Sequence, residues 1–230
     1  MNISCNAIAS FARFDQIPLR LLRVTICLLL SVVTPTWAQR SPDLIAGEQA
    51  YRQGDVRAAI AKLRPLADAG NAVAQALLGE ILDRAERDDE AITYFRKSAE
   101  QGNADGAYGL ASMLSVGEGG TKDPVAARSW FEKAAVAGHE GAVKGLASAY
   151  IGGGLDLTTE ARQSPDALRW IKLAVDLNFV PALDRMAKAN RLGEFGLPVD
   201  VKAAELLEAK SRTLRGVAPA KGKKNVAKPN

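Results

Sequence analysis

The sequence contains very little of the chemistry that cysteine and histidine provide. Its 230 residues include two cysteines, Cys5 and Cys27, and one histidine, His139. Both cysteines lie in the first 38 residues, so the rest of the chain has no thiol for a disulfide, a nucleophile or a thiolate metal site. A lone histidine has no second histidine or cysteine with which to bind zinc. We therefore expect no cofactor, no metal and no catalytic residue.

Aromatic residues and alternating β patterns are also scarce. Aromatic side chains make up 6% of the chain, although 47% of all residues are hydrophobic. Alternation of apolar and polar residues with β-branched side chains, which is typical of strands, is missing. Alanine is plentiful, and small side chains allow helices to approach closely. The composition therefore predicts an all-α protein.

The first 38 residues have the pattern of a targeting segment. Three arginines precede an apolar run over residues 24–33, which is followed by the small residues Thr36 and Ala38. Ten apolar residues are fewer than the roughly 20 that a membrane-spanning helix needs. The pattern predicts a secretory signal peptide over residues 1–38, cut after Ala38, and an exported protein in the periplasm or outside the cell. An uncleaved membrane anchor is the alternative.

The net charge of +4 is distributed unevenly. Residues 39–208 carry 20 basic and 25 acidic side chains, whereas residues 209–230 carry seven basic side chains and no acidic one. The basic character therefore belongs to the C-terminal tail and gives no reason to expect a nucleic acid partner. We predict that residues 211–230 form a disordered tail, because this stretch is poor in large apolar residues.

Four residues that favour helix ends recur along the chain. Gly70, Gly102, Gly138 and Asn178 are 32, 36 and 40 residues apart. Glycine and asparagine tolerate the left-handed conformation that ends many helices. Each is preceded by alanine eleven residues earlier and by large residues seven and eight residues earlier, which is the spacing of one helix face. Each spacing is that of one helix-turn-helix repeat.

The residues after each of these helix ends repeat as well. A large apolar residue follows eight positions later and a small residue follows it, as the pairs Leu78-Gly79, Leu110-Ala111, Leu146-Ala147 and Met186-Ala187. Expected helix starts are the caps Asn71 and Asn103 and the cap-proline pairs Asp123-Pro124 and Ser164-Pro165. About five successive pairs predict an α-solenoid over residues 39–210.

One segment also resembles a known repeat family. Residues 106–138 match the Sel-one-like repeat (SLR) family, relatives of the tetratricopeptide repeats, at Leu110, Gly117, Gly119, Asp123, Ala127, Trp130, Phe131, Ala134, Ala135 and Gly138. Gly106, Ala111 and Leu114 depart from the pattern, which has Ala, Gly and Tyr there. The resemblance extends over about residues 44–210 and implies an SLR solenoid, which the predicted signal peptide would direct out of the cytoplasm. It is specific for fold and nearly silent on function.

Three features invite a functional interpretation that the sequence does not support. The stretch GEGGTK over residues 117–122 lacks the spacing and preceding strand of a phosphate-binding loop, so we expect a turn. His139 follows a helix stop directly, where a cap or surface role is expected. Tyr94, Trp130, Phe131 and Trp170 occupy equivalent repeat positions, which predicts buried packing between helices rather than a ligand site.

The resemblance to tetratricopeptide proteins implies that the first helix of each pair lines a concave groove. The positions expected there are Ala76, Glu80, Asp83, Arg84, Tyr108, Ser112, Ser115, Lys144, Ser148, Ile151, Asp184, Lys188 and Arg191. Their charges run from acidic to basic along the chain. A protein or peptide segment with the opposite charge order is the expected partner, and a solvated face without a recognition role is the alternative.

These observations predict a non-enzymatic exported scaffold or regulator. The resemblance implies roles in bacterial envelope signalling, exopolysaccharide production or secretion assembly. It also implies a second hypothesis, a hydrolase acting on β-lactams, but the members with that activity carry paired cysteines that residues 39–230 lack. The lysines of the tail predict at most weak contact with an anionic envelope surface. The sequence does not determine the oligomeric state.

Overall fold

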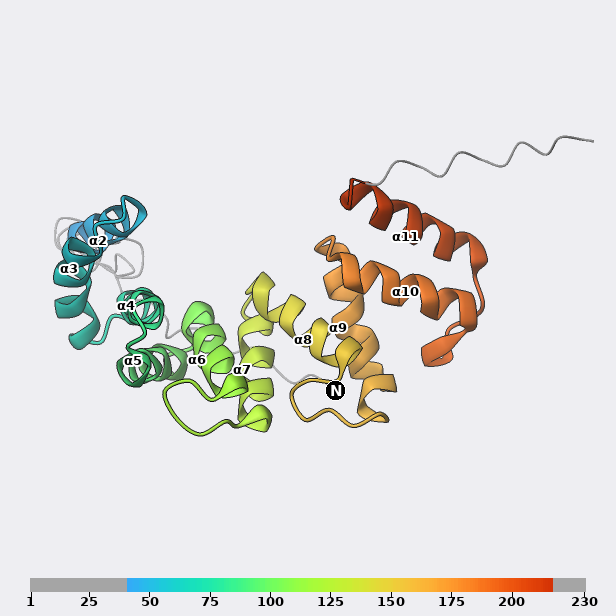
Figure 1. The fold of residues 1–230 in the computed structure, drawn as a ribbon, viewed down its shortest axis with the longest axis horizontal. Helices are drawn as coiled ribbons and strands as arrows, with labels where there is room; N and C mark the ends of the chain where they lie inside the picture. The colour runs from blue at the N-terminus through green and yellow to red at the C-terminus, as the bar shows by residue number, and fades with distance from the viewer. Residues whose placement is uncertain (1–40, 217–230) are drawn as a thin grey trace, which may run out of the picture. The chain divides into compact units, whose positions relative to one another are not determined.

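The computed structural model describes residues 41–216, and these form five antiparallel helical hairpins (Figure 1). The helices are α2 (Pro42–Arg52), α3 (Val56–Asp68), α4 (Ala72–Arg84), α5 (Asp88–Glu100), α6 (Ala104–Val116), α7 (Pro124–Val136), α8 (Glu140–Gly152), α9 (Pro165–Asp176), α10 (Val180–Leu192) and α11 (Val201–Leu214). Short 3-10 turns occupy Ala161–Gln163 and Glu194–Gly196. Within residues 41–216 the fold is all-α, as predicted.

Each hairpin has a first helix (α2, α4, α6, α8 or α10) and a second helix (α3, α5, α7, α9 or α11). Consecutive helices pack against one another, and the first helices α4 and α6, and α8 and α10, also touch. This pattern is that of an α-solenoid, in which each unit contacts only its neighbours. Across residues 41–216, no helix combines the length and the apolar character needed to cross a membrane. The predicted signal peptide and the tail beyond residue 216 lie outside the described residues.

The predicted helix starts are confirmed at all four positions. The side-chain oxygens of Asn71, Asn103, Asp123 and Ser164 each accept a hydrogen bond from the backbone N–H three residues later, at 2.8 to 3.3 Å. These bonds satisfy N–H groups that have no partner within the first helical turn. The repeat boundaries therefore follow from local chemistry.

The predicted helix stops are confirmed as well. Gly70, Gly102 and Gly138 have φ angles of +94°, +81° and +92°. Asn178 takes the same role with φ +56°, a conformation that asparagine adopts more readily than most residues. Each second helix therefore ends in a turn that reverses the chain into the next first helix.

The large-small pairs of the first helices are buried at the hairpin interfaces. Leu78, Leu110 and Leu146 are fully buried, whereas Met186 in the last hairpin is partly exposed. A Cβ atom on Gly79 would lie 2.8 Å from Cδ1 of Phe95, so only glycine allows α5 to approach α4 this closely.

The aromatic positions differ in burial more than their equivalent spacing predicts. Tyr94, Phe131 and Trp170 are buried, as expected. Trp130 is only partly buried, and its ring lies under the ammonium group of Lys133, whose Nζ is 3.6 Å from the ring centroid. The expected packing between helices is present here, but Trp130 is less buried than the other three aromatic residues, because its ring shares its surroundings with a cation and solvent.

The last hairpin extends beyond the predicted domain boundary at residue 210. Helix α11 continues to Leu214, and Ser211 within it is 2% exposed. The Ser211 hydroxyl donates a hydrogen bond of 2.6 Å to Asp184 of α10. The first residues assigned to the disordered tail are therefore helical and packed, and this boundary is corrected.

Candidate binding groove

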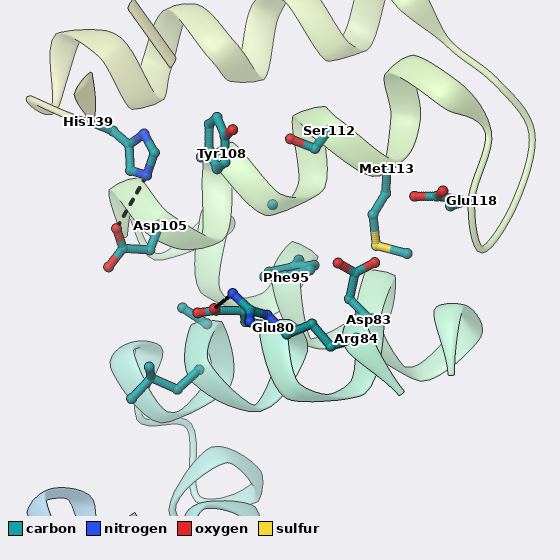
Figure 2. Close-up of a pocket in the computed structure, with 13 residues that line it drawn as sticks. Glu80, Asp83, Arg84, Phe95, Asp105, Tyr108, Ser112, Met113, Glu118 and His139 are labelled. Carbon is teal, nitrogen blue, oxygen red and sulfur yellow. Dashed lines mark hydrogen bonds and ion pairs between the residues drawn. The ribbon is translucent and has the colours of Figure 1, made fainter. Parts of the chain in front are cut away.

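A pocket of about 460 Å³ opens between the first helices α4 and α6. We call it the α4–α6 pocket, and its lining residues are Ala76, Leu77, Glu80, Asp83, Arg84, Phe95, Asp105, Tyr108, Gly109, Ser112, Met113, Glu118 and His139 (Figure 2). Five of the predicted partner-binding residues, Glu80, Asp83, Arg84, Tyr108 and Ser112, meet here, together with Ala76. The first helices of two successive hairpins therefore converge on one concave surface.

The base of the pocket is apolar because a second helix reaches it between two glycines. Phe95 of α5 is 5% exposed, and its ring lies against Gly79 of α4 and Gly109 of α6. A Cβ atom on Gly109 would lie 2.3 Å from Cε1 of Phe95. Tyr108 adds a second ring, which meets Phe131 edge-on at 5.7 Å between centroids. The base can therefore take the apolar part of a bound side chain.

One end of the pocket is formed by Asp105, Tyr108 and His139. Nδ1 of His139 accepts a 3.1 Å hydrogen bond from the N–H of Ala142, so His139 caps α8. Its ring is stacked on Tyr108, and its Nε2 lies 3.6 Å from Oδ1 of Asp105. The predicted capping role is confirmed, but the sequence did not indicate that this cap also lines a pocket. The sequence did contain one signal for this position: His139 directly follows a helix-stop glycine, as the caps Asn71 and Asn103 do.

Glu80 is held by partners within the chain. Its Oε1 accepts a hydrogen bond of 2.9 Å from Nη2 of Arg84 and one of 3.3 Å from the hydroxyl of Tyr51 on α2. Burial, followed by the nearby charge of Glu80, raises the pKa of Tyr51, so this hydroxyl stays protonated and able to donate. Tyr51 was not among the predicted site residues, because its contact joins residues 29 positions apart.

The surroundings of Asp83 disfavour the charged form of its carboxyl group. Burial raises its pKa, and the negative charges of Asp88 and Glu80 raise it further, whereas Arg84 opposes the shift. Neither Asp83 nor Glu118 forms an ion pair with any residue between 41 and 216. Figure 2 shows both at the end of the pocket that contains Met113. Within residues 41–216 no ion pair neutralises these two carboxylates, and Arg84 offsets the charge of Asp83 only in part.

The remaining predicted residues lie elsewhere. Lys144 and Ser148 are on α8, where Lys144 faces Glu140 at 3.5 Å and Ser148 is exposed. Asp184 on α10 accepts hydrogen bonds from Ser211 and Arg215 of α11. Neither helix contributes these side chains to the α4–α6 pocket.

The two basic residues of α10 that were predicted to bind a partner have acidic neighbours. Arg191 donates a 2.7 Å hydrogen bond to Glu208 of α11, and Nζ of Lys188 lies 3.7 Å from Glu194. The basic side chains expected at this end of the groove are thus paired with acidic side chains of the last hairpin and its turn.

The pocket contains the elements of a binding surface. It offers two aromatic rings, a thioether, a hydroxyl and several carboxylates, which together suit a mixed apolar and cationic ligand. In the described part of the chain, no three histidine, aspartate or glutamate side chains gather closely enough to hold a metal ion.

Comparison with known proteins assigns the repeats. The Sel1 repeat family model matches residues 72–103 and 104–139, which are the two hairpins that form the pocket. A similar solved structure is a protective antigen from uropathogenic Escherichia coli displaying an SLR fold, with 21% identity and a TM-score of 0.60 over 73% of this chain and 40% of that one. A Sel1 repeat protein from Oxalobacter formigenes has 25% identity and a TM-score of 0.60, over 70% and 46% of the two chains.

This chain spans less than half the length of either solved structure. The likeness to them supports the fold, and the fold is one suited to protein–protein interaction. The protein is therefore an α-solenoid that contains Sel1 repeats and has the SLR fold.

Proposed function

We propose that the chain is a non-enzymatic binding protein that holds a segment of a protein partner in the α4–α6 pocket. The observation that carries this proposal is the convergence of Glu80, Asp83, Arg84, Tyr108 and Ser112 from two first helices on one concave surface. A surface shared by two repeats suits an extended segment that contacts both, and repeat proteins use such surfaces for recognition.

We further propose that the protein acts outside the cytoplasm. The basic, apolar and small-residue order of residues 1–38 supports export, and a role in envelope signalling, exopolysaccharide production or secretion assembly follows as part of the proposal. N-terminal sequencing of the protein recovered from the periplasm and the medium tests export. A start at Gln39 supports it, and retention of the intact leader in the cytoplasm contradicts it.

In-cell crosslinking with mass spectrometry of the tagged protein tests partner binding. The decisive variant is Ser112→Trp, because Ser112 lines the pocket and an indole there fills it whatever the charge of the partner. The matched control is Thr93→Trp on α5, which adds the same ring at an exposed position outside the pocket. Loss of the same crosslinked partner only in Ser112→Trp supports the proposal, and equal capture by both variants contradicts it.

A further inference from the structure

The α4–α6 pocket has two ends of different electrostatic character. At one end Asp105 faces His139, and Glu80 is occupied by Arg84 and Tyr51 along the α4 side. At the other end neither Asp83 nor Glu118 forms an ion pair within residues 41–216, although the charge of Arg84 acts on Asp83. The two carboxylates that form no ion pair therefore lie at the end near Met113 (Figure 2).

The surface between these ends suits the stem of a long side chain. Leu77, Phe95, Tyr108 and Met113 supply apolar atoms along the base, and Phe95 and Met113 are buried. Lysine and arginine pair such an apolar stem with a charged tip, and they place the stem on apolar surface while the tip reaches polar groups. An acidic partner side chain would instead meet Asp83, Glu118 and Asp105 and would be repelled.

The pKa of Asp83 is shifted in the direction that a nearby cation would reverse. Its pKa is raised first by burial and then by Asp88 and Glu80, with only Arg84 acting in the opposite direction. A cation placed beside this carboxylate would lower its pKa again and recover Coulomb energy that the unbound chain lacks. A cationic ligand would therefore add to the partial compensation that Arg84 gives Asp83.

We propose that the α4–α6 pocket binds a lysine or arginine side chain of an extended partner segment, with its stem on Phe95 and Tyr108 and its cationic tip toward Asp83 and Glu118. This inference rests on the proposed function and names the chemistry of the partner. It assigns recognition to a single basic residue flanked by apolar ones. Charge-assisted hydrogen bonds to carboxylates are among the stronger polar contacts in proteins.

Fluorescent peptides test this pairing directly. The probe is Ser-Gly-Ala-Leu-Lys-Leu-Ala-Gly-Ser with blocked ends, and its matched partner carries acetyl-lysine, which keeps the stem and removes the charge. We expect the purified full chain to bind the lysine peptide about tenfold more tightly by fluorescence anisotropy. Raising the salt concentration should reduce this preference because exposed charges are screened.

Variants locate the site. The double variant Asp83→Asn with Glu118→Gln should abolish the preference for lysine over acetyl-lysine. The control Glu100→Gln removes the same kind of charge from an exposed position on α5 and should leave the preference intact. Circular dichroism confirms that each variant is folded.

Three outcomes overturn the proposal. The first is equal binding of the two peptides, and the second is a preference that survives the double variant. The third is binding of the lysine peptide only after Lys221, Lys223, Lys224 and Lys228 are replaced by glutamine in the full chain, because the chain's own tail would then be the occupant. None of these results decides whether Ser112→Trp blocks partner capture in cells, so failure of this inference is distinguishable from failure of the proposed function.

Discussion

The imidazole ring of His139 is stacked on the phenol ring of Tyr108, with ring centroids 4.2 Å apart and an interplanar angle of 20°. The same imidazole caps α8 through Nδ1. One side chain therefore ends the turn between two hairpins and fixes a ring that lines the α4–α6 pocket. Capping and groove shape are coupled at this position.

Replacement of His139 should separate these two roles. We expect His139→Ala to lower the free energy of unfolding by about 1 kcal/mol, because a helix cap is lost. His139→Asn should recover most of that loss, since asparagine caps α4 and α6 at the equivalent positions. Urea denaturation of the three proteins measures the difference. Equal stabilities of the alanine and asparagine variants would contradict the capping role.

Two equivalent glycines should respond oppositely to alanine. A Cβ atom on Gly109 would lie 2.3 Å from Phe95, whereas one on Gly145 would lie 3.6 Å from Phe131, an ordinary contact. We expect Gly109→Ala to destabilise the fold by about 1–3 kcal/mol through overpacking. Gly145→Ala should be neutral or stabilise by up to about 1 kcal/mol, because alanine favours helix.

Thermal melts of the two alanine variants measure this contrast. A melting temperature of Gly109→Ala equal to or above that of the parent would show that Phe95 can move away at no cost. The glycine would then not be required for the base of the pocket.

The two tryptophans should differ in their contribution to stability. Trp170 is 3% exposed, so Trp170→Ala should cost about 3–5 kcal/mol. Trp130→Ala should cost clearly less, because Trp130 is only partly buried beside Lys133. Chemical denaturation of both variants provides the comparison, and a Trp130 variant as unstable as the Trp170 variant would mean that Trp130 contributes as much to the core as Trp170 does.

Asp83 should reduce stability at neutral pH. Its pKa is raised in the folded chain, mainly by burial, so the folded state holds the proton more tightly than the unfolded state does. Its contribution is therefore most favourable below the unfolded pKa of about 3.9 and is lost as the pH rises through the folded pKa. We expect Asp83→Asn to raise the melting temperature at pH 7.

The gain from Asp83→Asn should shrink as the pH falls toward 3, where the native aspartic acid is itself neutral. Melts across this pH range, with Glu100→Gln as the control, measure the effect. A variant less stable than the parent at pH 7 would mean that the Asp83 carboxylate is stabilised by a contact within the chain. If Asp83→Asn both stabilises the fold and weakens binding of the lysine peptide, then Asp83 serves recognition at a cost in stability.

The end of the last hairpin gives a prediction about truncation. A chain that ends at residue 216 keeps α11 intact and should melt like the full chain. A chain that ends at residue 210 loses buried Ser211 and the bond from Arg215 to Asp184, so it should melt at a lower temperature. Equal melting of the two truncated chains would mean that the end of α11 contributes nothing to stability.

The repeat architecture was predictable because its signals are local. Asn71 and Asn103 as caps, and Gly70 and Asn178 as stops, act on backbone groups within a few residues of themselves. The spacing of these signals therefore predicted the hairpins without knowledge of any long-range contact. The burial of Leu78 and its equivalents follows from the same helical periodicity.

The groove was predicted only in part because its lining depends on contacts between hairpins. The resemblance to tetratricopeptide proteins, combined with helical position, indicated Glu80, Asp83 and Tyr108. It could not reveal that Phe95 reaches the pocket from a second helix, or that Tyr51 binds Glu80 from the preceding hairpin.

The charges of α10 show the same limitation. Asp184 and Arg191 occupy groove-like positions, but α11 supplies Ser211, Arg215 and Glu208 as partners for them. Helical periodicity gives the position of a charged residue, whereas its partner depends on the sequence of the neighbouring helix.

Glu208 has a consequence for how this protein unfolds. It occupies the position at which the other second helices have the buried residues Leu63, Phe95, Phe131 and Ile171. Glu208 is instead paired with Arg191 of α10. The packing of α11 on α10 therefore lacks the buried apolar side chain that each of the other second helices has at this position. Amide hydrogens of α11 should exchange with deuterium before those of α4 to α7, so that the molecule opens stepwise from this end.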